Sequence, residues 1–199
     1  TCDNEAAYAY MQKGIQAEWF PVWADERVFN WDRSDKTIDI STTAVPTPVR
    51  NTRGFLEVND ALQQRFGNRF QNPMRDRQGL SYIPMEENGD LFRKSKIVFQ
   101  FSSSCEMTRR IVEGAACRAM ILTDRLHPIR NIQSLFIEDK DIVYYSTTEE
   151  CLEKAEYYLG NDIEREKIAE NMYQKILKYH TGIARASNFI DLYESYFGK

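Results

Sequence analysis

A group of hydroxyl and guanidinium side chains stands between two apolar segments, in a pattern that suits a phosphate ligand. The group comprises Ser102, Ser103, Ser104, Thr108, Arg109 and Arg110. Arginine offers a permanently charged, planar set of donors, and serine and threonine add hydroxyl donors. At the start of a helix, unpaired backbone N–H groups strengthen the preference for an anion. The pattern therefore favours a phosphate-binding site around these residues.

The flanking segments predict the elements that would position this group. Residues 97–101 and 119–122 are apolar strand candidates, and the segment between them has the length of a loop and a helix. Strands that are apolar on both faces and separated by a helix are typical of a parallel sheet with helices on both sides. The carboxyl ends of such strands and the amino ends of the helices meet at one edge of the sheet. We expect the phosphate-binding residues at that edge.

The same order of strand, loop and helix occurs earlier in the chain. Residues 37–41 are rich in β-branched side chains, and residues 42–48 contain two prolines that oppose a helix. A helix is predicted from residue 52 to residue 66, and Arg50 and Arg53 stand near its start. If both units share one sheet, these arginines reach the same edge as the group above. They are equally compatible with two solvated surface arginines.

The remaining segments complete an α/β fold. Further helices are predicted over residues 4–13, 88–95, 146–160, 162–179 and 183–197, the third of them begun by a capping box from Ser146 to Glu149. Further strands are predicted over residues 17–23 and 142–145, with shorter ones at 69–70 and 80–83. A polar connector at residues 33–36 is the expected domain boundary. The alternation predicts an α/β fold, a parallel sheet with helices on both faces and a helical C-terminal end.

Composition narrows the functional classes. The 199 residues are enough for one well-buried domain, and the net charge of −4 argues against a general nucleic-acid binder. No apolar run approaches the roughly 20 residues of a membrane span. The four cysteines are scattered, with no CxxC pair, so we expect no metal site, and we prefer reduced thiols in a cytoplasmic protein to a disulfide framework. We expect no cofactor. The start of the chain has neither an initiator Met nor the pattern of a signal peptide, so we expect an excised domain.

Several segments together resemble one enzyme family. Residues 109–117, Arg-Arg-Ile-Val-Glu-Gly-Ala-Ala-Cys, are followed by the apolar strand candidate and by Thr123-Asp124. This order resembles the group-1 glycosyltransferases, especially the spore-maturation (CgeB-type) branch. Residues 17–29, 140–145 and 179–181 are similar to other parts of that family. The resemblance implies the GT-B architecture, with two Rossmann-like domains, of which this chain would hold the second.

The resemblance also implies ligands and roles. Residues 1–36 would be a crossover from a missing or reduced N-terminal domain, and residues 37–199 would bind a nucleoside diphosphate sugar, with an unknown acceptor. Glu113 would accept hydrogen bonds from the donor ribose, and Arg109 or Arg110 would face the diphosphate. The implied binding set is Glu113, Arg109, Arg110, Thr108, Ser104, Arg50 and Arg53, with no catalytic residue assigned.

Three departures from the family pattern and several alternatives accompany this interpretation. Glu106 and Glu113 are seven positions apart instead of eight, Arg118 replaces a glycine, and residues 42–48 replace a glycine-rich loop. Glu113 is also compatible with an ordinary helical ion pair to Arg109 or Arg110. The aromatic group Trp19, Phe20, Trp23, Phe29 and Trp31 suits either a stacked sugar or base, or a domain interface. Two alternative functions are a non-catalytic interaction module with this fold and a different phosphate-binding α/β enzyme.

Overall fold

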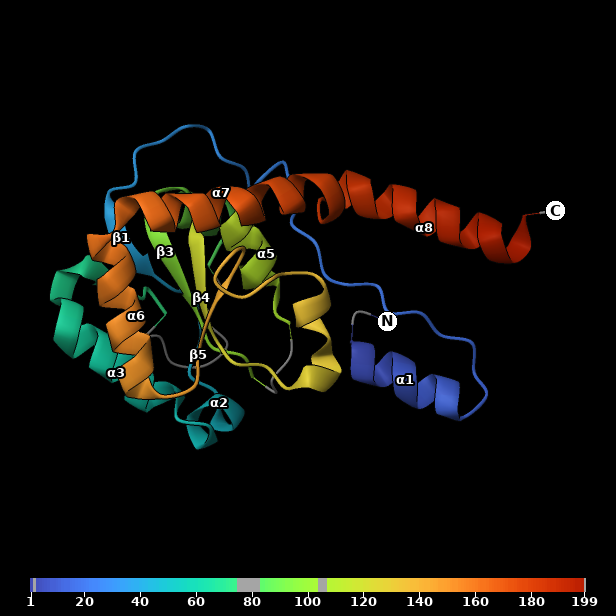
Figure 1. The fold of residues 1–199 in the computed structure, drawn as a ribbon, viewed down its shortest axis with the longest axis horizontal. Helices are drawn as coiled ribbons and strands as arrows, with labels where there is room; N and C mark the ends of the chain where they lie inside the picture. The colour runs from blue at the N-terminus through green and yellow to red at the C-terminus, as the bar shows by residue number, and fades with distance from the viewer. Residues whose placement is uncertain (2, 75–82, 104–106, 199) are drawn as a thin grey trace.

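A parallel β-sheet forms the centre of the protein. The computed structural model describes residues 1, 3–74, 83–103 and 107–198. Within these residues, the strands are β1 (Ile38–Ser41), β2 (Phe70–Gln71), β3 (Ser95–Gln100), β4 (Met120–Asp124) and β5 (Val143–Tyr145). They lie in the order β2-β1-β3-β4-β5, and every neighbouring pair is parallel (Figure 1). The predicted α/β class with a parallel sheet is confirmed.

Helices cover both faces of the sheet because the strand residues alternate between two apolar cores. Ile97 and Phe99 of β3 pack with α3 (Phe55–Phe66) and α6 (Thr148–Gly160) on one face. Val98, between them, packs on the other face with α4 (Met85–Arg93) and α5 (Arg109–Ala116). The long helix α7 (Asp162–Tyr179) contributes side chains to both cores. This two-sided burial explains the continuous apolar runs of the central strands.

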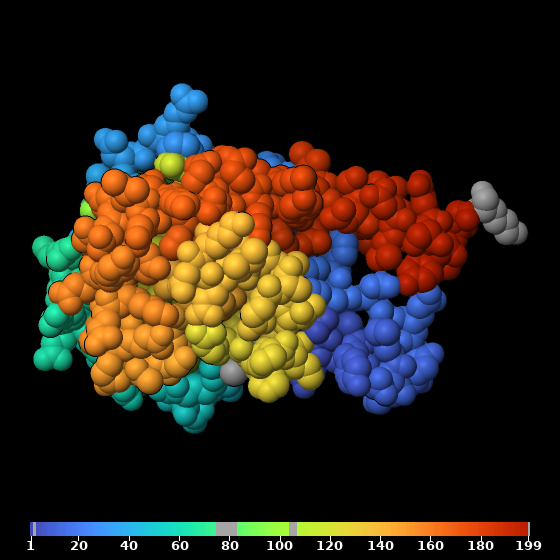
Figure 2. All heavy atoms as spheres, in the orientation of Figure 1, coloured from blue at the N-terminus to red at the C-terminus, as the bar shows by residue number. Residues whose placement is uncertain are grey.

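Two terminal helices extend beyond this layered body. Helix α1 (Asn4–Gln12) and helix α8 (Gly182–Phe197) project from the same side of the molecule (Figures 1 and 2). No residue of α8 is buried, although Ile183, Phe189, Ile190, Tyr193 and Phe197 are large, apolar and exposed. A helix gains most of its stability from packing an apolar face. Helix α8 therefore presents a face that suits a packing partner.

Short helical segments join the main elements at the edges of the sheet. Helix α2 (Pro48–Thr52) precedes α3, and three 3₁₀ segments, η1 (Gly67–Arg69), η2 (Pro128–Arg130) and η3 (Ile132–Ser134), occupy connections. The helix predicted over residues 52–66 is α3, which begins later, at Phe55, and Gly54, in a left-handed conformation with φ of 91°, separates it from α2. Pro48 starts α2, a position where the missing N–H of proline costs nothing.

Other sequence expectations need correction. Residues 17–23, predicted as a strand, belong to no strand, and only the following Ala24 forms an isolated bridge, with Thr181. The capping of α6 is shifted by one residue: Thr147 caps the helix, and the Glu150 carboxylate accepts from the Ser146 N–H. Of the predicted strand at residues 80–83, residues 80–82 lie outside the described residues. The helix predicted over residues 88–95 is α4, which begins earlier, at Met85.

Candidate functional site

The sheet has a topological switch point between β1 and β3. From β1 the chain passes to β2 on one side, and β3 lies on the other side. In open α/β sheets, ligands bind beyond the carboxyl ends of the strands at such a point. A cavity of about 450 Å³ opens there, which we call the switch-point pocket. Its volume falls within the range of small-molecule sites.

The polar wall of the switch-point pocket comes from three separate parts of the chain. Arg50 belongs to α2, Thr108 to Arg110 form the start of α5, and Arg130 lies at the end of η2. Asp3 and Asn4 complete this wall at the beginning of the chain, and Trp19, Val22 and Met107 form an apolar wall. The pocket therefore combines a cationic side with an aromatic one.

Arg50, which lines this pocket, is positioned by hydrogen bonds to two loops. Its Nε donates to the Phe101 carbonyl oxygen at 3.2 Å, and a terminal nitrogen donates to the Val45 carbonyl oxygen at 2.9 Å. Thr47 accepts from the Arg50 N–H at 3.2 Å and so caps α2. These contacts tie the connection after β1 to the end of β3, and they place a buried positive charge between the two strands.

The start of α5 brings two further arginines and a hydroxyl. Arg110 donates from Nε to Gln100 Oε1 at 2.7 Å, and Gln100 is fully buried at the end of β3. Thr108 takes the cap position of α5, but its buried Oγ1 has no hydrogen-bond partner among the residues that the structure describes. A polar atom of this kind is ready to meet a ligand donor or acceptor. The Arg109 side chain is more than half exposed, at 58%, and it forms an ion pair with Glu113.

Glu113 lies one helical turn behind this wall. It is 7% exposed, and its Oε1 is 3.4 Å from Arg109 Nε. Burial raises the pKa of the Glu113 carboxyl above its usual value, whereas Arg109 and Arg110 act to lower it. The helical ion pair considered from the sequence therefore exists, but its acidic partner is buried and not on the surface. Glu113 does not itself line the pocket, but Arg109, its ion-pair partner, does.

Arg130 is a cationic group that the sequence reasoning missed. Its guanidinium contacts both carboxylate oxygens of Asp3, at 2.7 and 2.8 Å, and Glu5 at 2.8 Å. Asn4 also donates to the Ile129 carbonyl oxygen at 2.7 Å. These contacts fasten the start of α1 against η2 at the rim of the pocket. No local spacing in the sequence indicates an interaction between residues 127 positions apart.

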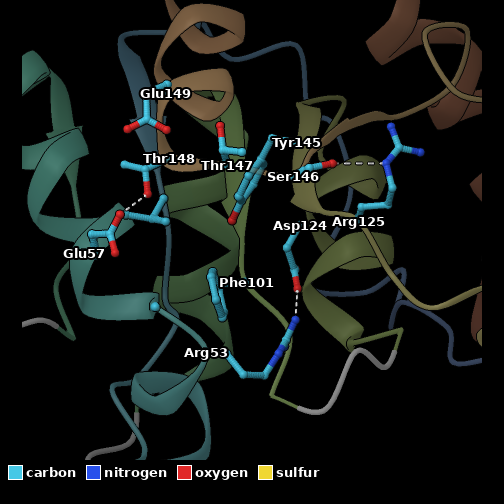
Figure 3. A pocket seen from close by; sticks show the side chains of 12 residues that line it. Arg53, Glu57, Phe101, Asp124, Arg125, Tyr145, Ser146, Thr147, Thr148 and Glu149 are labelled. Atoms are coloured by element: carbon cyan, nitrogen blue, oxygen red, sulfur yellow. Dashed lines mark hydrogen bonds and ion pairs between the residues drawn. The ribbon is translucent and has the colours of Figure 1, made fainter.

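A neighbouring cavity of about 480 Å³, the edge pocket, lies at the ends of β3, β4 and β5 (Figure 3). Arg53 lines this cavity and not the switch-point pocket. It donates to the Ser102 carbonyl oxygen at 2.6 Å and to Asp124 Oδ2 at 2.9 Å, and it lies over the Phe101 ring at 5.1 Å. Asp124 also accepts from the Ser102 N–H at 2.8 Å. Arg53 thus reaches the expected edge of the sheet, where its charge is already paired.

The other residues singled out in the sequence fall in different places. Ser104 and Glu106 lie outside the described residues. Arg118 adopts a left-handed conformation with φ of 55°, as its place at a family glycine suggests, and its guanidinium lies 4.2 Å from the centre of the Trp31 ring. Of the five aromatic residues, Trp19 lines the switch-point pocket, while Phe20 packs edge-on against Phe189 of α8. Phe29 is buried in the core and packs with Phe92.

Sequence comparison identifies a family. The model of the family described as "Glycosyl transferase-like" matches residues 50–191, which is more than half of the chain. The matched range includes the arginines that line the two pockets. No curated protein matches the chain.

Solved structures with the same fold include a synthase and a domain of a group 1 glycosyl transferase family protein. The Anabaena protein HepE, solved with UDP and glucose, is 11% identical with a TM-score of 0.71 over 98% of this chain and 62% of its own. Sucrose-phosphate synthase from Thermosynechococcus elongatus is 11% identical with a TM-score of 0.67, over 99% of this chain and 57% of its own. The C-terminal domain of LpcC, a group 1 glycosyl transferase family protein from Francisella tularensis, is 13% identical with a TM-score of 0.61. It is matched over 99% of its length by 80% of this chain.

These matches show a shared fold, and they also show a difference in length. The chain spans about three fifths of the length of HepE and of the sucrose-phosphate synthase, at 62% and 57% respectively. The isolated C-terminal domain, in contrast, is matched almost completely.

Proposed function

The chain belongs to the glycosyl transferase-like family, and from that membership we propose that it is the donor-binding domain of a glycosyltransferase. Its ligand would be a nucleoside diphosphate sugar, from which the sugar passes to an acceptor of unknown identity. The observation that carries this proposal is the convergence of Arg50 from α2 with Arg109 and Arg110 from α5 at the switch point of the sheet. The UDP complex of HepE, which has the same fold, is consistent with this choice of ligand.

The cationic wall suits a diphosphate for electrostatic reasons. Arginine binds phosphate oxygens through paired N–H donors, and it keeps its charge at every physiological pH. In the transfer reaction, negative charge builds on the leaving diphosphate, so fixed donors at that place stabilise the transition state. Arg50 and Arg110 are already anchored by the contacts to Phe101 and Gln100. We assign them, with Arg109 and Thr108, to the diphosphate.

Glu113 would bind the ribose hydroxyls after Arg109 has left Glu113 to bind the diphosphate. The Glu113 carboxylate offers two acceptor oxygens, which match two adjacent ribose hydroxyls. The 3.4 Å contact with Arg109 is the interaction that a diphosphate would replace, because the mostly exposed guanidinium can turn toward the cavity. Arg53 could bind the diphosphate only if it exchanged its hydrogen bond to Asp124 for one to the ligand.

The terminal segments fit a protein with a second domain. We propose that residues 1–36 connect to such a domain and that residues 37–199 form the donor-binding unit, with the acceptor site outside this chain. Two observations support this division: the larger relatives extend beyond the matched region, and α8 exposes Phe189, Ile190, Tyr193 and Phe197. No helix among the described residues is long and apolar enough to cross a membrane, and Cys117 and Cys151 are buried free thiols. The expected cytoplasmic location remains part of this proposal.

A thermal-shift screen with nucleoside diphosphates and nucleotide sugars tests the proposed function. A ligand that binds only the folded protein at 100 times its Kd stabilises it by about 2.7 kcal/mol, which raises the Tm of a domain of this size by about 5–11 °C. Glu113→Ala should abolish most of the shift for a nucleotide, whereas Glu153→Ala on the exposed face of α6 should leave it intact. Absence of a shift with every common nucleoside diphosphate and its sugars would refute the proposal.

A further inference from the structure

The apolar wall of the switch-point pocket has no role in binding phosphate. Trp19, Val22 and Met107 line the same cavity as the charged and polar residues Arg50, Thr108, Arg109 and Arg110. A pocket for a bare phosphate would need only donors and charge. The presence of a large aromatic side chain in the same cavity indicates a ligand with a flat, apolar part joined to its anionic part.

Trp19 is held in place by contacts on both sides along the chain. The N–H of its neighbour Phe20 donates to the Thr1 carbonyl oxygen at 2.7 Å. Asp3, two residues after Thr1, accepts a hydrogen bond from Arg130 at 2.8 Å. The Phe20 ring packs edge-on against Phe189 of α8, with ring centres 6.2 Å apart, and the Arg185 guanidinium lies 5.4 Å from the Phe20 ring centre. The polypeptide on which Trp19 stands is therefore anchored to η2 on one side and to α8 on the other.

We propose that Trp19 is the stacking platform for the nucleobase of the ligand, and that it sets the preference of the pocket for a nucleotide over a simple diphosphate. This inference rests on the proposed function and assigns the second half of the same ligand. With the diphosphate on Arg109 and Arg110, the base lies against the indole ring, which lines the same cavity. Stacking of a base on an aromatic ring tolerates every base because each has a π-face.

Calorimetric titrations with UDP and with inorganic pyrophosphate separate the two halves of the site. Removal of a stacking aromatic weakens nucleic-acid ligands by about 5- to 150-fold, so Trp19→Ala should raise the Kd for UDP by at least about tenfold. The Kd for pyrophosphate should stay within about twofold, because that ligand has no base. Trp19→Phe should recover most of the affinity for UDP. Trp23→Ala, which removes a 42% exposed indole from the same segment outside the pocket, should change neither Kd.

Tryptophan fluorescence gives a second readout that a merely structural role would not produce. In the double variant Trp23→Phe/Trp31→Phe, Trp19 is the remaining indole of the three in the chain. UDP should quench its emission, and pyrophosphate should leave the emission unchanged.

The possible results distinguish this inference from the proposed function. If the wild type binds UDP and Trp19→Ala binds it equally well, or loses UDP and pyrophosphate in the same proportion, Trp19 is not a stacking platform. If UDP binds no better than pyrophosphate to the wild type, the base has no platform although the phosphate site stands. If neither ligand binds, the proposed function fails and this inference fails with it.

Discussion

The loss of the Asp124 carboxylate should destabilise the protein more than the loss of any surface charge. Asp124 accepts from the Ser102 N–H and Oγ, at 2.8 and 2.6 Å, and from Arg53 at 2.9 Å. The side chain of Asp124 is 8% exposed and that of Arg53 is 26% exposed. Removal of one partner from a buried ion pair costs about 3–5 kcal/mol, because the other charge stays behind without compensation. Arg53 keeps some contact with water, so we expect Asp124→Ala to cost about 3 kcal/mol.

Differential scanning calorimetry measures this effect directly. For a chain of this length, about 3 kcal/mol corresponds to a decrease in Tm of about 6–12 °C. Glu156→Ala is the matched control, because it breaks the surface pair with Arg65, whose side chains are 57% and 55% exposed. Such a pair contributes about 0–1 kcal/mol. The double variant Asp124→Ala/Arg53→Ala should be more stable than the sum of its single variants predicts. A Tm for Asp124→Ala equal to that of Glu156→Ala would refute the account of this network.

Two further perturbations test the packing and the buried charges. A methyl group at Gly114 would lie 2.9 Å from Ile121 Cδ1, so Gly114→Ala should lower the free energy of unfolding by about 1–3 kcal/mol in urea denaturation. Gly160→Ala is the control, because its methyl group would meet nothing within 4 Å, and it should be neutral or stabilising. Burial and the adjacent Arg185 lower the pKa of His180 to about 4. The unfolded chain takes up a proton below its ordinary value of 6.5 while the folded protein does not, so wild-type stability should fall as pH decreases from 6.5 to 4. His180→Gln should lack this component, and identical pH profiles for the two proteins in chemical denaturation would contradict it.

The central sheet could be predicted because its signals are local. Strands β3, β4 and β5 are buried on both faces, so each contains a continuous apolar run that is visible in the sequence. The start of α5 at Arg109 follows from the polar loop before it, and the need for a left-handed turn at Arg118 follows from the family comparison. These features depend on neighbours within a few positions, which is the range that sequence patterns cover.

The segment at residues 17–23 was predicted wrongly because an apolar run does not specify its packing partner. Phe20 and Trp23 pack against each other, and Phe20 packs against Phe189 of α8, so the apolar surface is covered by side chains of a helix and not by a sheet. Pro21, which lacks a donor, sits within this run. This run therefore lines the switch-point pocket through Trp19 and Val22 and packs against α8 through Phe20.

The division of the arginines between two pockets could not be read from the sequence. Arg50 and Arg53 are three positions apart, yet the first faces the switch-point pocket and the second pairs with Asp124, 71 positions away. Likewise, the burial of Glu113 depends on how α5 packs on β3 and β4. The residue types indicate phosphate chemistry, but only the folded arrangement shows which charges are already paired.

A crystal structure of the UDP complex tests the central claim most directly. The account predicts the diphosphate in the switch-point pocket, with its oxygens within hydrogen-bond distance of the Arg109 and Arg110 guanidinium groups, and with Arg109 turned away from Glu113. It also predicts the ribose hydroxyls on the Glu113 carboxylate. Density for UDP in the edge pocket beside Arg53 and Asp124, with the contact between Arg109 and Glu113 unchanged, would contradict it.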